Sequence, residues 1–550
     1  MSDYDKVRIA YDAEKDLNSY QAKQGLGPKS DSTLESGVNE MVDRKFETGI
    51  RTGREAGASG SDRKPIPEEE GGIRDDRGRL AKAGQFTGPG GPEDKVKLES
   101  ERRPGDQDTL GIQDLKLHEA NKADVNEAVA GAKAAFPAWR DLSPTQRGKY
   151  FHKLASLIRE HEQEFARLEA LSSGKPVSRY IDASVAADAF SYFAEAGWTV
   201  QGSSSWNTPG QLNITSREPY GVVAAIIPWN VPFVFFGIKI APALAAGNTI
   251  VLKSSEKAPL TCALGAKLIA EAGFPPGVVN VLSGYGPTTG AILASHMEVR
   301  CLSFTGSTQT GRKIQSYAAL SNLKTVHVEL GGKTPAIIFP DADLESAAAQ
   351  TSFSVQIFSG QTCNANSRIY VHESVADKFL AMFKSMFGAA VLGDPLDKET
   401  TLGPQVDQIQ YERVKSYLIA GEKEGILTLG GDAKNGYFIK PTVFENAPED
   451  AQIMKEEVFG PVVVINTFRT EEEVLAKAND SEYGLYAAVF TRDIDRAVRV
   501  SKLLEAGTVG VNCTSPCMPK DMPFGGFRGV EGVVRAFCIV WMAISRPRLS

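Results

Sequence analysis

The sequence lacks the long apolar runs that membrane-spanning segments require. The longest run near its end, residues 536–544, falls well short of the roughly 20 residues that cross a bilayer. The first residues, Met1 to Asp5, lack the basic and apolar regions of a secretory signal and are too acidic for a typical transit peptide. We therefore expect a cytoplasmic protein without a membrane partner.

Cysteine is scarce, with six residues in a chain of 550. The six lack the spacing of a disulfide framework, Cys513 and Cys517 do not form a CxxC pair, and the six histidines lie away from them. Structural zinc sites and disulfide scaffolds need such clusters. We expect free thiols in a reducing compartment and no bound metal.

A strong positive charge is also absent. The net charge of −7 offers no basic surface for nucleic acid or an anionic membrane. A chain of 550 residues is too long for one hydrophobic core, so two or more domains are expected. Residues 1–110 hold few aromatics and many glycines and mixed charges, which predicts a disordered polar arm. A specific binding role for this arm stays an alternative.

The rest of the chain shows helical and strand patterns. Helical spacing of apolar residues covers 123–139, 146–171 and 259–272. Short apolar segments that read as strands fall at 221–227, 249–252, 278–282, 299–304, 326–330 and 368–371. Apolar strands that alternate with helices predict an α/β fold with a parallel sheet covered on both faces. Ligands bind such sheets at the carboxyl ends of the strands.

Polar residues follow the first two of these strands. Asn230 lies in Pro228-Trp229-Asn230-Val231-Pro232, where it could cap the next helix or donate its amide to an oxyanion. Lys253 and Glu256, after the second strand, could form a solvated ion pair or bind the hydroxyls of an adenosine ribose. A carboxylate at that position accepts from a free 2′-hydroxyl and repels a 2′-phosphate, which favours NAD over NADP.

A glycine turn follows the fourth strand, in Phe304-Thr305-Gly306-Ser307-Thr308. It opens a helix, whose first N–H groups could hold a pyrophosphate. The sequence has no GxGxxG here, and a simple N-cap is the competing interpretation.

A glutamate and a cysteine supply the candidate chemistry. Glu329 ends the fifth strand before Gly331 and Gly332, where a buried carboxylate must be paired or have a raised pKa. Cys363 lies in a loop of polar and small residues, a setting that favours a reactive thiolate over inert packing. A cysteine can form a thioester, and a carboxylate can activate the water that cleaves it.

These motifs, in this order, resemble the NAD(P)-dependent aldehyde dehydrogenase superfamily from about residue 124 to 527. The sixth motif is Glu456-Glu457-Val458-Phe459-Gly460-Pro461. The resemblance implies a Rossmann-like NAD-binding domain over 111–331, with a β oligomerisation element at 201–219, and an α/β catalytic domain over 332–527. It also implies a homodimer or homotetramer acting on a small-molecule aldehyde.

The resemblance also implies roles for individual residues. Cys363 would be the nucleophile, Asn230 the oxyanion donor and Glu329 the base for hydrolysis. The implied cofactor contacts are Ile226, Ile227, Trp229, Lys253, Glu256, Gly286, Gly290, Phe304, Gly306, Ser307, Thr310, Leu330, Glu457 and Phe459. The implied substrate tunnel holds Val231, Phe235, Ile357, Thr362 and Asn364, which suits small to medium aliphatic or aromatic aldehydes.

Both ends of the chain depart from the family pattern, before Lys116 and over 528–550. We expect the candidate oligomerisation strand at 211–217 to lack its usual partner. An impaired relative that only binds dinucleotide or serves as an assembly subunit is therefore an alternative function. A coenzyme A-acylating enzyme is a third, which the presence of Glu329 disfavours.

Overall fold

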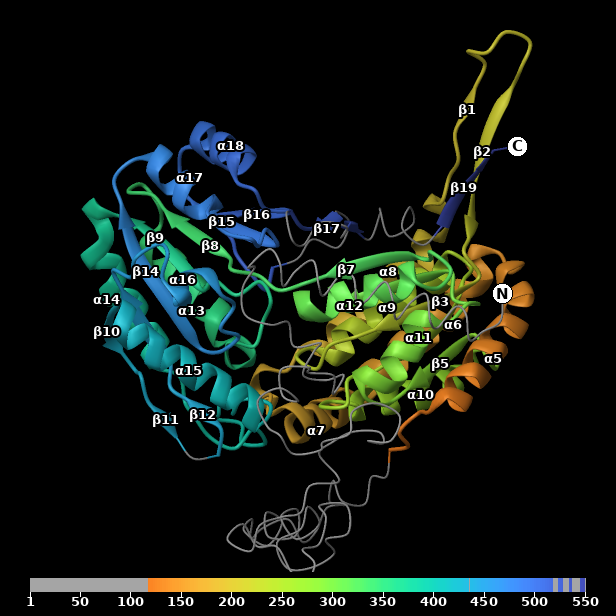
Figure 1. Ribbon diagram of the computed structural model, residues 1–550, viewed down its shortest axis with the longest axis horizontal. Helices are drawn as coiled ribbons and strands as arrows, with labels where there is room; N and C mark the ends of the chain where they lie inside the picture. The colour runs from red at the N-terminus through yellow and green to blue at the C-terminus, as the bar shows by residue number, and fades with distance from the viewer. Residues whose placement is uncertain (1–116, 435, 518–522, 528–533, 537–544, 550) are drawn as a thin grey trace, which may run out of the picture. The chain divides into compact units, whose positions relative to one another are not determined.

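The computed structural model describes residues 117–434, 436–517, 523–527, 534–536 and 545–549. The predicted arm at 1–110 lies outside these residues, as does most of the tail at 528–550. Within the described part, two separate helix-covered sheets each form a hydrophobic core (Figure 1).

The first sheet has five parallel strands in the order β5-β4-β3-β6-β7. Their bounds are β3 (Val222–Ile226), β4 (Thr249–Lys253), β5 (Val279–Leu282), β6 (Cys301–Thr305) and β7 (Thr325–Glu329). The strand order reverses between β3 and β6, and α/β sheets bind ligands beside such a reversal. All five strands were predicted from their apolar runs, and the predicted parallel sheet is confirmed.

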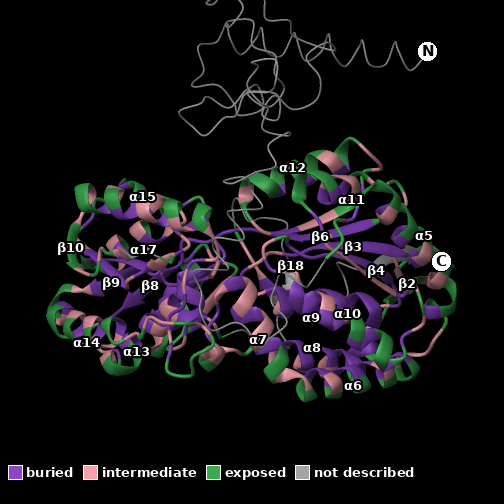
Figure 2. Cartoon of the chain, turned by 90° about the horizontal axis from the view of Figure 1, so that it is seen from below, coloured by how far each residue is buried: buried purple, intermediate pink, exposed green. Residues whose placement is uncertain are grey.

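Helices cover both faces of this sheet, and their inner sides are buried with the strands (Figure 2). One face packs against α6 (Pro144–Glu160), α8 (Asp182–Ala196), α9 (Pro232–Ala245) and α10 (Leu260–Ala272). The other face packs against α5 (Lys122–Arg140), α11 (Ala291–Ser295) and α12 (Thr308–Ala319). The helices predicted at 123–139 and 259–272 correspond to α5 and α10.

The single helical pattern predicted over 146–171 is wrong at its centre. The structure ends α6 at Glu160 and begins α7 (Glu162–Ser173) after His161. His161 leaves helical geometry at φ −101° and ψ 14°, and its N–H and ring Nδ1 both lie within hydrogen-bond reach of the Leu157 carbonyl. Apolar periodicity cannot detect this break because both helices bury the same side.

The second sheet has seven strands in the order β10-β13-β14-β9-β8-β15-β16, parallel except at β10. Their bounds are β8 (Pro335–Ile338), β9 (Arg368–His372), β10 (Ile426–Leu429), β13 (Thr442–Glu445), β14 (Val462–Phe468), β15 (Tyr486–Phe490) and β16 (Thr508–Val511). One face packs against α13 (Leu344–Gln356) and α14 (Ala376–Gly388). The opposite face packs against α15 (Gln408–Glu424), α16 (Gln452–Lys455), α17 (Glu471–Asn479) and α18 (Ile494–Leu503).

Two small antiparallel pairs of strands lie outside the two main sheets. They are β11 (Ala433–Lys434) with β12 (Phe438–Ile439), and β17 (Pro523–Gly525) with β18 (Val534–Ala536). Among the described residues, no helix combines the length and apolarity that crossing a bilayer would need.

A third sheet contains the predicted β element. β1 (Ser204–Ser205) and β2 (Asn213–Pro219) form an antiparallel ribbon that projects from the body, as Figure 1 shows. The expectation that this strand lacks a partner is wrong, because β19 (Ser545–Leu549) pairs with β2 over five residues. Sequence comparison by motif could not find this pairing, since backbone hydrogen bonds do not require a particular side-chain motif.

Candidate active site

Cys363 follows a tightly wound turn, η7 (Ile357–Gly360), and precedes β9. Phe358, Ser359 and Gly360 all have positive φ, at 52°, 58° and 74°. Such backbone in non-glycine residues costs free energy and persists only where the surroundings hold it. The holding contacts are Ser359 Oγ to Gly403 O at 2.8 Å and Val406 N to Gln361 Oε1 at 3.0 Å. Contacts within the protein thus hold the turn that leads to Cys363 in one conformation.

Asn230 contacts this turn from the other sheet. Its Nδ2 donates to the carbonyl oxygen of Gln361 at 2.9 Å, and the side chain is buried. The interpretation of Asn230 as a helix cap is wrong, because Val231 holds the N-cap position of α9 without a side-chain bond. One amide hydrogen is used by Gln361, and the second remains for a ligand oxygen. Motif reasoning missed Gln361, although it directly precedes Thr362-Cys363.

Glu329 is buried at the carboxyl end of β7, as the sequence predicted. Thr305, at the end of the neighbouring strand β6, donates its hydroxyl to Glu329 Oε2 at 3.1 Å. The backbone joins the same strands where Gly306 N donates to Glu329 O at 3.0 Å. Thr305 is a site residue that the sequence analysis did not single out, although it lies inside the quoted glycine-turn motif.

The two glycines after Glu329 bring three motifs into contact. A Cβ on Gly331 would lie 2.3 Å from Glu457 Oε2, and one on Gly332 would lie 2.1 Å from the Cys363 carbonyl oxygen. Gly332 N also donates to Glu457 Oε1 at 2.9 Å. Only glycine permits such approach, so these positions bring the Glu329, Cys363 and Glu457 segments together. Burial raises the pKa of the Glu457 carboxyl to about 7, and the Gly332 N–H partly opposes that shift.

Lys253 and Glu256 lie at the carboxyl end of β4. Lys253 is buried, donates to Ser254 O at 2.8 Å and lies 3.5 Å from the Glu256 carboxylate. Burial lowers the pKa of Lys253, while Glu256 raises it. The solvated-pair interpretation is therefore wrong for Lys253, because an ammonium group in that position is removed from bulk water.

Two further predicted cofactor turns lie on the same sheet. The structure shows Ser307 as the N-cap of α12, accepting from Thr310 N at 3.3 Å, so the simple N-cap is present. Gly286 and Gly290 bound a short π-helical turn. A Cβ on Gly290 would lie 3.8 Å from the Lys253 side chain, while Gly286 meets open space. Gly290 and Lys253 are thus neighbours.

Aromatic contacts also connect the two sheets. The rings of Trp229 and Phe459 meet edge to face with centroids 5.4 Å apart, and Phe459 has a positive φ of 59°. Lys257 Nζ lies 5.5 Å from the Trp229 ring. The remaining predicted cofactor residues have side chains buried in the core, namely Ile226, Ile227, Phe304 and Leu330. A ligand would meet their backbone.

The predicted tunnel residues differ in exposure. Phe235, Ile357 and Asn364 are buried, whereas Val231 and Thr362 are half-buried. Among the residues that the structure describes, the buried Asn364 Oδ1 atom has no hydrogen-bond partner. Thr362 lines a small cavity together with Gly332, Glu457 and Phe459. The structure thus places Thr362 beside two predicted cofactor residues, and the tunnel itself stays a prediction.

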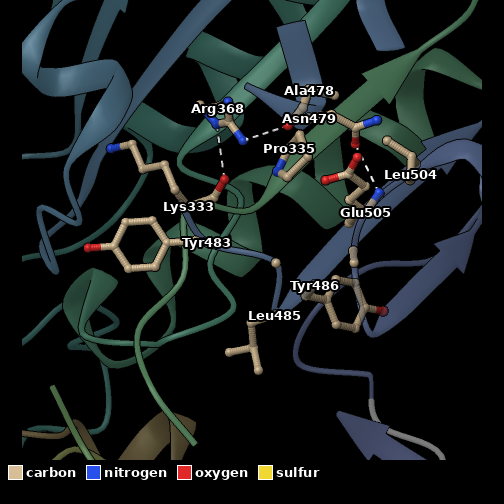
Figure 3. Close-up of a pocket in the computed structure, with 13 residues that line it drawn as sticks. Lys333, Pro335, Arg368, Ala478, Asn479, Tyr483, Leu485, Tyr486, Leu504 and Glu505 are labelled. Atoms are coloured by element: carbon tan, nitrogen blue, oxygen red, sulfur yellow. Dashed lines mark hydrogen bonds between the residues drawn. The ribbon is translucent and has the colours of Figure 1, made fainter. Parts of the chain in front are cut away.

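Arg368 holds the backbone behind the glycine pair. Its Nε donates to Lys333 O at 3.0 Å and its Nη2 to Ala478 O at 3.0 Å, as Figure 3 shows. A further bond of 3.3 Å runs from Nη1 to Lys477 O. This buried arginine, at the start of β9, is a supporting residue that the sequence analysis missed. A charged residue at the start of a buried strand was the available signal.

Two other cysteines are packing residues. Cys262 and Cys301 are buried in the core of the first sheet. Burial raises the pKa of Cys301 to about 12 and also raises that of Cys262. Cys363 is less buried than either, which is what an attacking thiol needs.

Comparisons with known proteins agree with these motifs. The model of the aldehyde dehydrogenase family matches residues 101–531. An aldehyde dehydrogenase of Davidiella tassiana is 44% identical over 432 residues, which cover 77% of this chain and 86% of that protein. Human retinal dehydrogenase 2 is also 44% identical, over 76% of this chain and 82% of its own length. A NAD+ complex of a Bacillus cereus aldehyde dehydrogenase superposes with a TM-score of 0.76 at 39% identity, covering 78% and 89%.

Proposed function

Because the chain belongs to the aldehyde dehydrogenase family, we propose that it oxidises an aldehyde to a carboxylic acid with NAD as hydride acceptor. The observation that carries this proposal is the contact of three segments at Gly331 and Gly332. Those segments hold the thiol Cys363, the carboxylate Glu329 and the carboxylate Glu457. A thioester route requires a nucleophile and a base, and these two lie on adjoining segments.

Cys363 attacks the aldehyde carbon through its thiolate, and the carbonyl oxygen becomes an oxyanion. The free amide hydrogen of Asn230 donates to that oxyanion, together with the Cys363 backbone N–H. Asn230 is already held by Gln361, so the donor needs little reorganisation as charge develops. The strained turn before Cys363 fixes the backbone donor in the same way.

Glu329 accepts a proton from the water that hydrolyses the thioester. Its buried position excludes bulk solvent, and Thr305 orients the carboxylate by donating its hydroxyl to one of the two oxygens. Hydrolysis returns the Cys363 thiol and releases the carboxylic acid. This base also supports hydrolysis over transfer to coenzyme A.

The residues at the strand ends fit a dinucleotide. Bound NAD supplies the acceptor for the hydride that leaves the substrate carbon. Lys253 and Glu256 would bind the adenosine ribose, Gly306 and Ser307 the pyrophosphate, and Glu457 the nicotinamide ribose. The open space beside Gly286, next to Gly290 and Lys253, suits the adenine end. The Glu256 carboxylate disfavours a 2′-phosphate, so NADP is the poorer cofactor.

The substrate class is a small to medium aliphatic or aromatic aldehyde. The half-buried Val231 and Thr362 with the buried Phe235, Ile357 and Asn364 would form its tunnel. Two of the relatives bear the names aldehyde dehydrogenase and retinal dehydrogenase 2. Retinal is larger than the class that we propose, so it is a useful comparison substrate.

The projecting ribbon supports self-association. Trp206, Leu212 and Ile214 on β2 and its turn are exposed, with 75% of the Trp206 surface accessible. Large apolar side chains on a projecting ribbon favour burial against another subunit. The ribbon would make a homodimer or homotetramer, in a reducing cytoplasm where the free thiols persist.

The experiment measures NADH formation with propanal, benzaldehyde and retinal, with Cys363→Ala as the control. Turnover that requires Cys363 supports the proposal, and equal rates in both proteins would sink it. Glu329→Gln should still give one burst of NADH and then stop at the thioester. If that variant turns over when coenzyme A is added and the parent also needs coenzyme A, the acylating alternative holds instead. Calorimetric binding of NAD without any burst would point to the impaired alternative.

A further inference from the structure

The loop after β16 holds two cysteines on either side of a turn. Cys513 and Cys517 are four residues apart, and both are free. The chain turns between them, with Cys517 N donating to Thr514 O at 3.0 Å. The Cys517 side chain is close enough to raise the pKa of the Cys513 thiol. Two cysteines that a turn brings close together are candidates for a disulfide.

Two of the three residues between the cysteines contact the segment that follows the nucleophile. Thr514 and Ser515 are buried, and Thr514 Oγ1 donates to Asn366 Oδ1 at 2.6 Å. The hydroxyl of Ser515 pairs with that of Ser354, which in turn accepts from Asn366 N at 3.1 Å. Asn366 lies three residues after Cys363. A movement of Thr514 or Ser515 would therefore disturb the loop of the nucleophile.

The base of the loop is held firmly. Asn512 N donates to Val489 O at 2.8 Å, and Asn512 Nδ2 donates to Thr491 O at 2.8 Å. Thr491 N returns a bond to Asn512 Oδ1 at 3.0 Å. These bonds hold the start of the loop, so a movement between Cys513 and Cys517 would affect the contacts of Thr514 and Ser515 with Asn366 and Ser354.

We propose that Cys513 and Cys517 form a reversible disulfide by exchange with a low-molecular-weight disulfide such as oxidised glutathione. Exposed Cys517 attacks first: its sulfur bonds to one glutathione sulfur, the glutathione S–S bond breaks, and the leaving thiolate takes the proton. The Cys513 sulfur then bonds to the Cys517 sulfur and displaces the second glutathione as a thiolate. This thiolate takes the second proton. The protein loses two hydrogens, and the glutathione disulfide is reduced to two thiols.

The order of attack follows from exposure. Cys517 is exposed, whereas Cys513 is half-buried. Burial, and then the neighbouring Cys517, raise the pKa of the Cys513 thiol. A thiol with a raised pKa is a poor first attacker, but it can resolve a mixed disulfide that is held beside it.

The effect on activity follows from the contacts. The disulfide form shifts Thr514 and Ser515, so it disturbs the Asn366 segment and lowers aldehyde turnover, while the dithiol form is active. This effect rests on the proposed function. Formation of the disulfide does not, and it is measured without an assay of activity.

The test equilibrates the full chain in glutathione buffers from reducing to oxidising, followed by acid quench, alkylation and tryptic mass mapping. Peptide 503–520 contains both cysteines, and its disulfide form escapes alkylation and is two hydrogens lighter than the free dithiol. We expect this peptide to convert reversibly. Stable glutathione adducts on separate cysteines, or a link from either one to Cys363 or Cys538, would overturn the proposal.

The activity arm compares the parent with Cys517→Ser in the same buffers. Because a small misplacement of a catalytic group costs one to two powers of ten, we expect the parent to lose turnover by about tenfold or more. Cys517→Ser should lose only what direct modification of Cys363 causes, and dithiothreitol should restore the difference. An equal loss of turnover in both proteins would show that the disulfide does not regulate activity. If the chain proves inactive under all conditions, the peptide mapping still decides whether the disulfide exists.

Discussion

The side-chain amide of Asn230 donates to the carbonyl oxygen of Gln361 at 2.9 Å, across 131 residues of sequence. Gln361 lies two residues before Cys363, so this bond connects the turn after β3 to the loop of the proposed nucleophile. It fixes the orientation of an amide whose second hydrogen is available to substrate. The same contact would therefore support both the stability of the fold and the proposed oxyanion role of Asn230.

Replacing Asn230 should separate these two roles. Asn230→Ala removes an oxyanion donor and should lower kcat by about 10²–10³. It also leaves a buried carbonyl unpaired, at a cost of about 1–3 kcal/mol in unfolding free energy. Steady-state kinetics and urea unfolding measure the two effects, and cofactor affinity should not change. A raised KM with an unchanged kcat would contradict the oxyanion role.

Gly332→Ala should distort the site directly. Its Cβ would lie 2.1 Å from the Cys363 carbonyl oxygen, and backbone cannot move away as a flexible side chain could. Overpacking of this kind costs on the order of 1–3 kcal/mol. Gly286→Ala is the matched control for stability, because its Cβ meets nothing within 4 Å. Equal unfolding midpoints for the two variants would contradict the close approach.

Glu457 should make stability depend on pH. Burial raises the pKa of its carboxyl from 4.5 to about 7. Between those values the folded state holds a proton that the unfolded state has released, so stability falls as pH rises through this window. The Glu457→Gln variant should not show this loss of unfolding free energy. In the parent the loss is at most about 3 kcal/mol, and solvent screening reduces it.

Urea unfolding at pH 5 and pH 8 provides the measurement. The parent should lose stability relative to Glu457→Gln between the two values. Glu472→Gln, a change at an exposed glutamate, is the control and should follow the parent. A parent and Glu457→Gln that keep a constant difference would show that the pKa of this carboxyl is not raised.

Lys175 should be needed for folding stability. Its Nζ lies 2.6 Å from Asp182 and 3.2 Å from Glu169, all three are buried, and it sits 4.1 Å from the Phe358 ring. Lys175→Met leaves two buried carboxylates uncompensated, so it should cost about 3–5 kcal/mol. The triple variant that adds Glu169→Gln and Asp182→Asn should recover much of this loss. A triple variant as unstable as Lys175→Met alone would contradict the charge argument.

Much of the fold follows from local pattern. The five strands of the first sheet are predictable because each is a short apolar run between helices, a pattern typical of a parallel sheet buried on both faces. The break at His161 and the pairing of β19 with β2 are not predictable in this way. Both depend on backbone hydrogen bonds, and these bonds do not require particular side chains.

Residue types and motifs are enough to predict the reaction class, because they single out Cys363 and Glu329. The way in which the site is held together depends instead on how distant segments pack. Asn230 with Gln361, Thr305 with Glu329, and Gly332 with Cys363 are contacts between segments far apart in the chain. These contacts result from the packing of the two sheets. The spacing of residues along the sequence does not predict that packing.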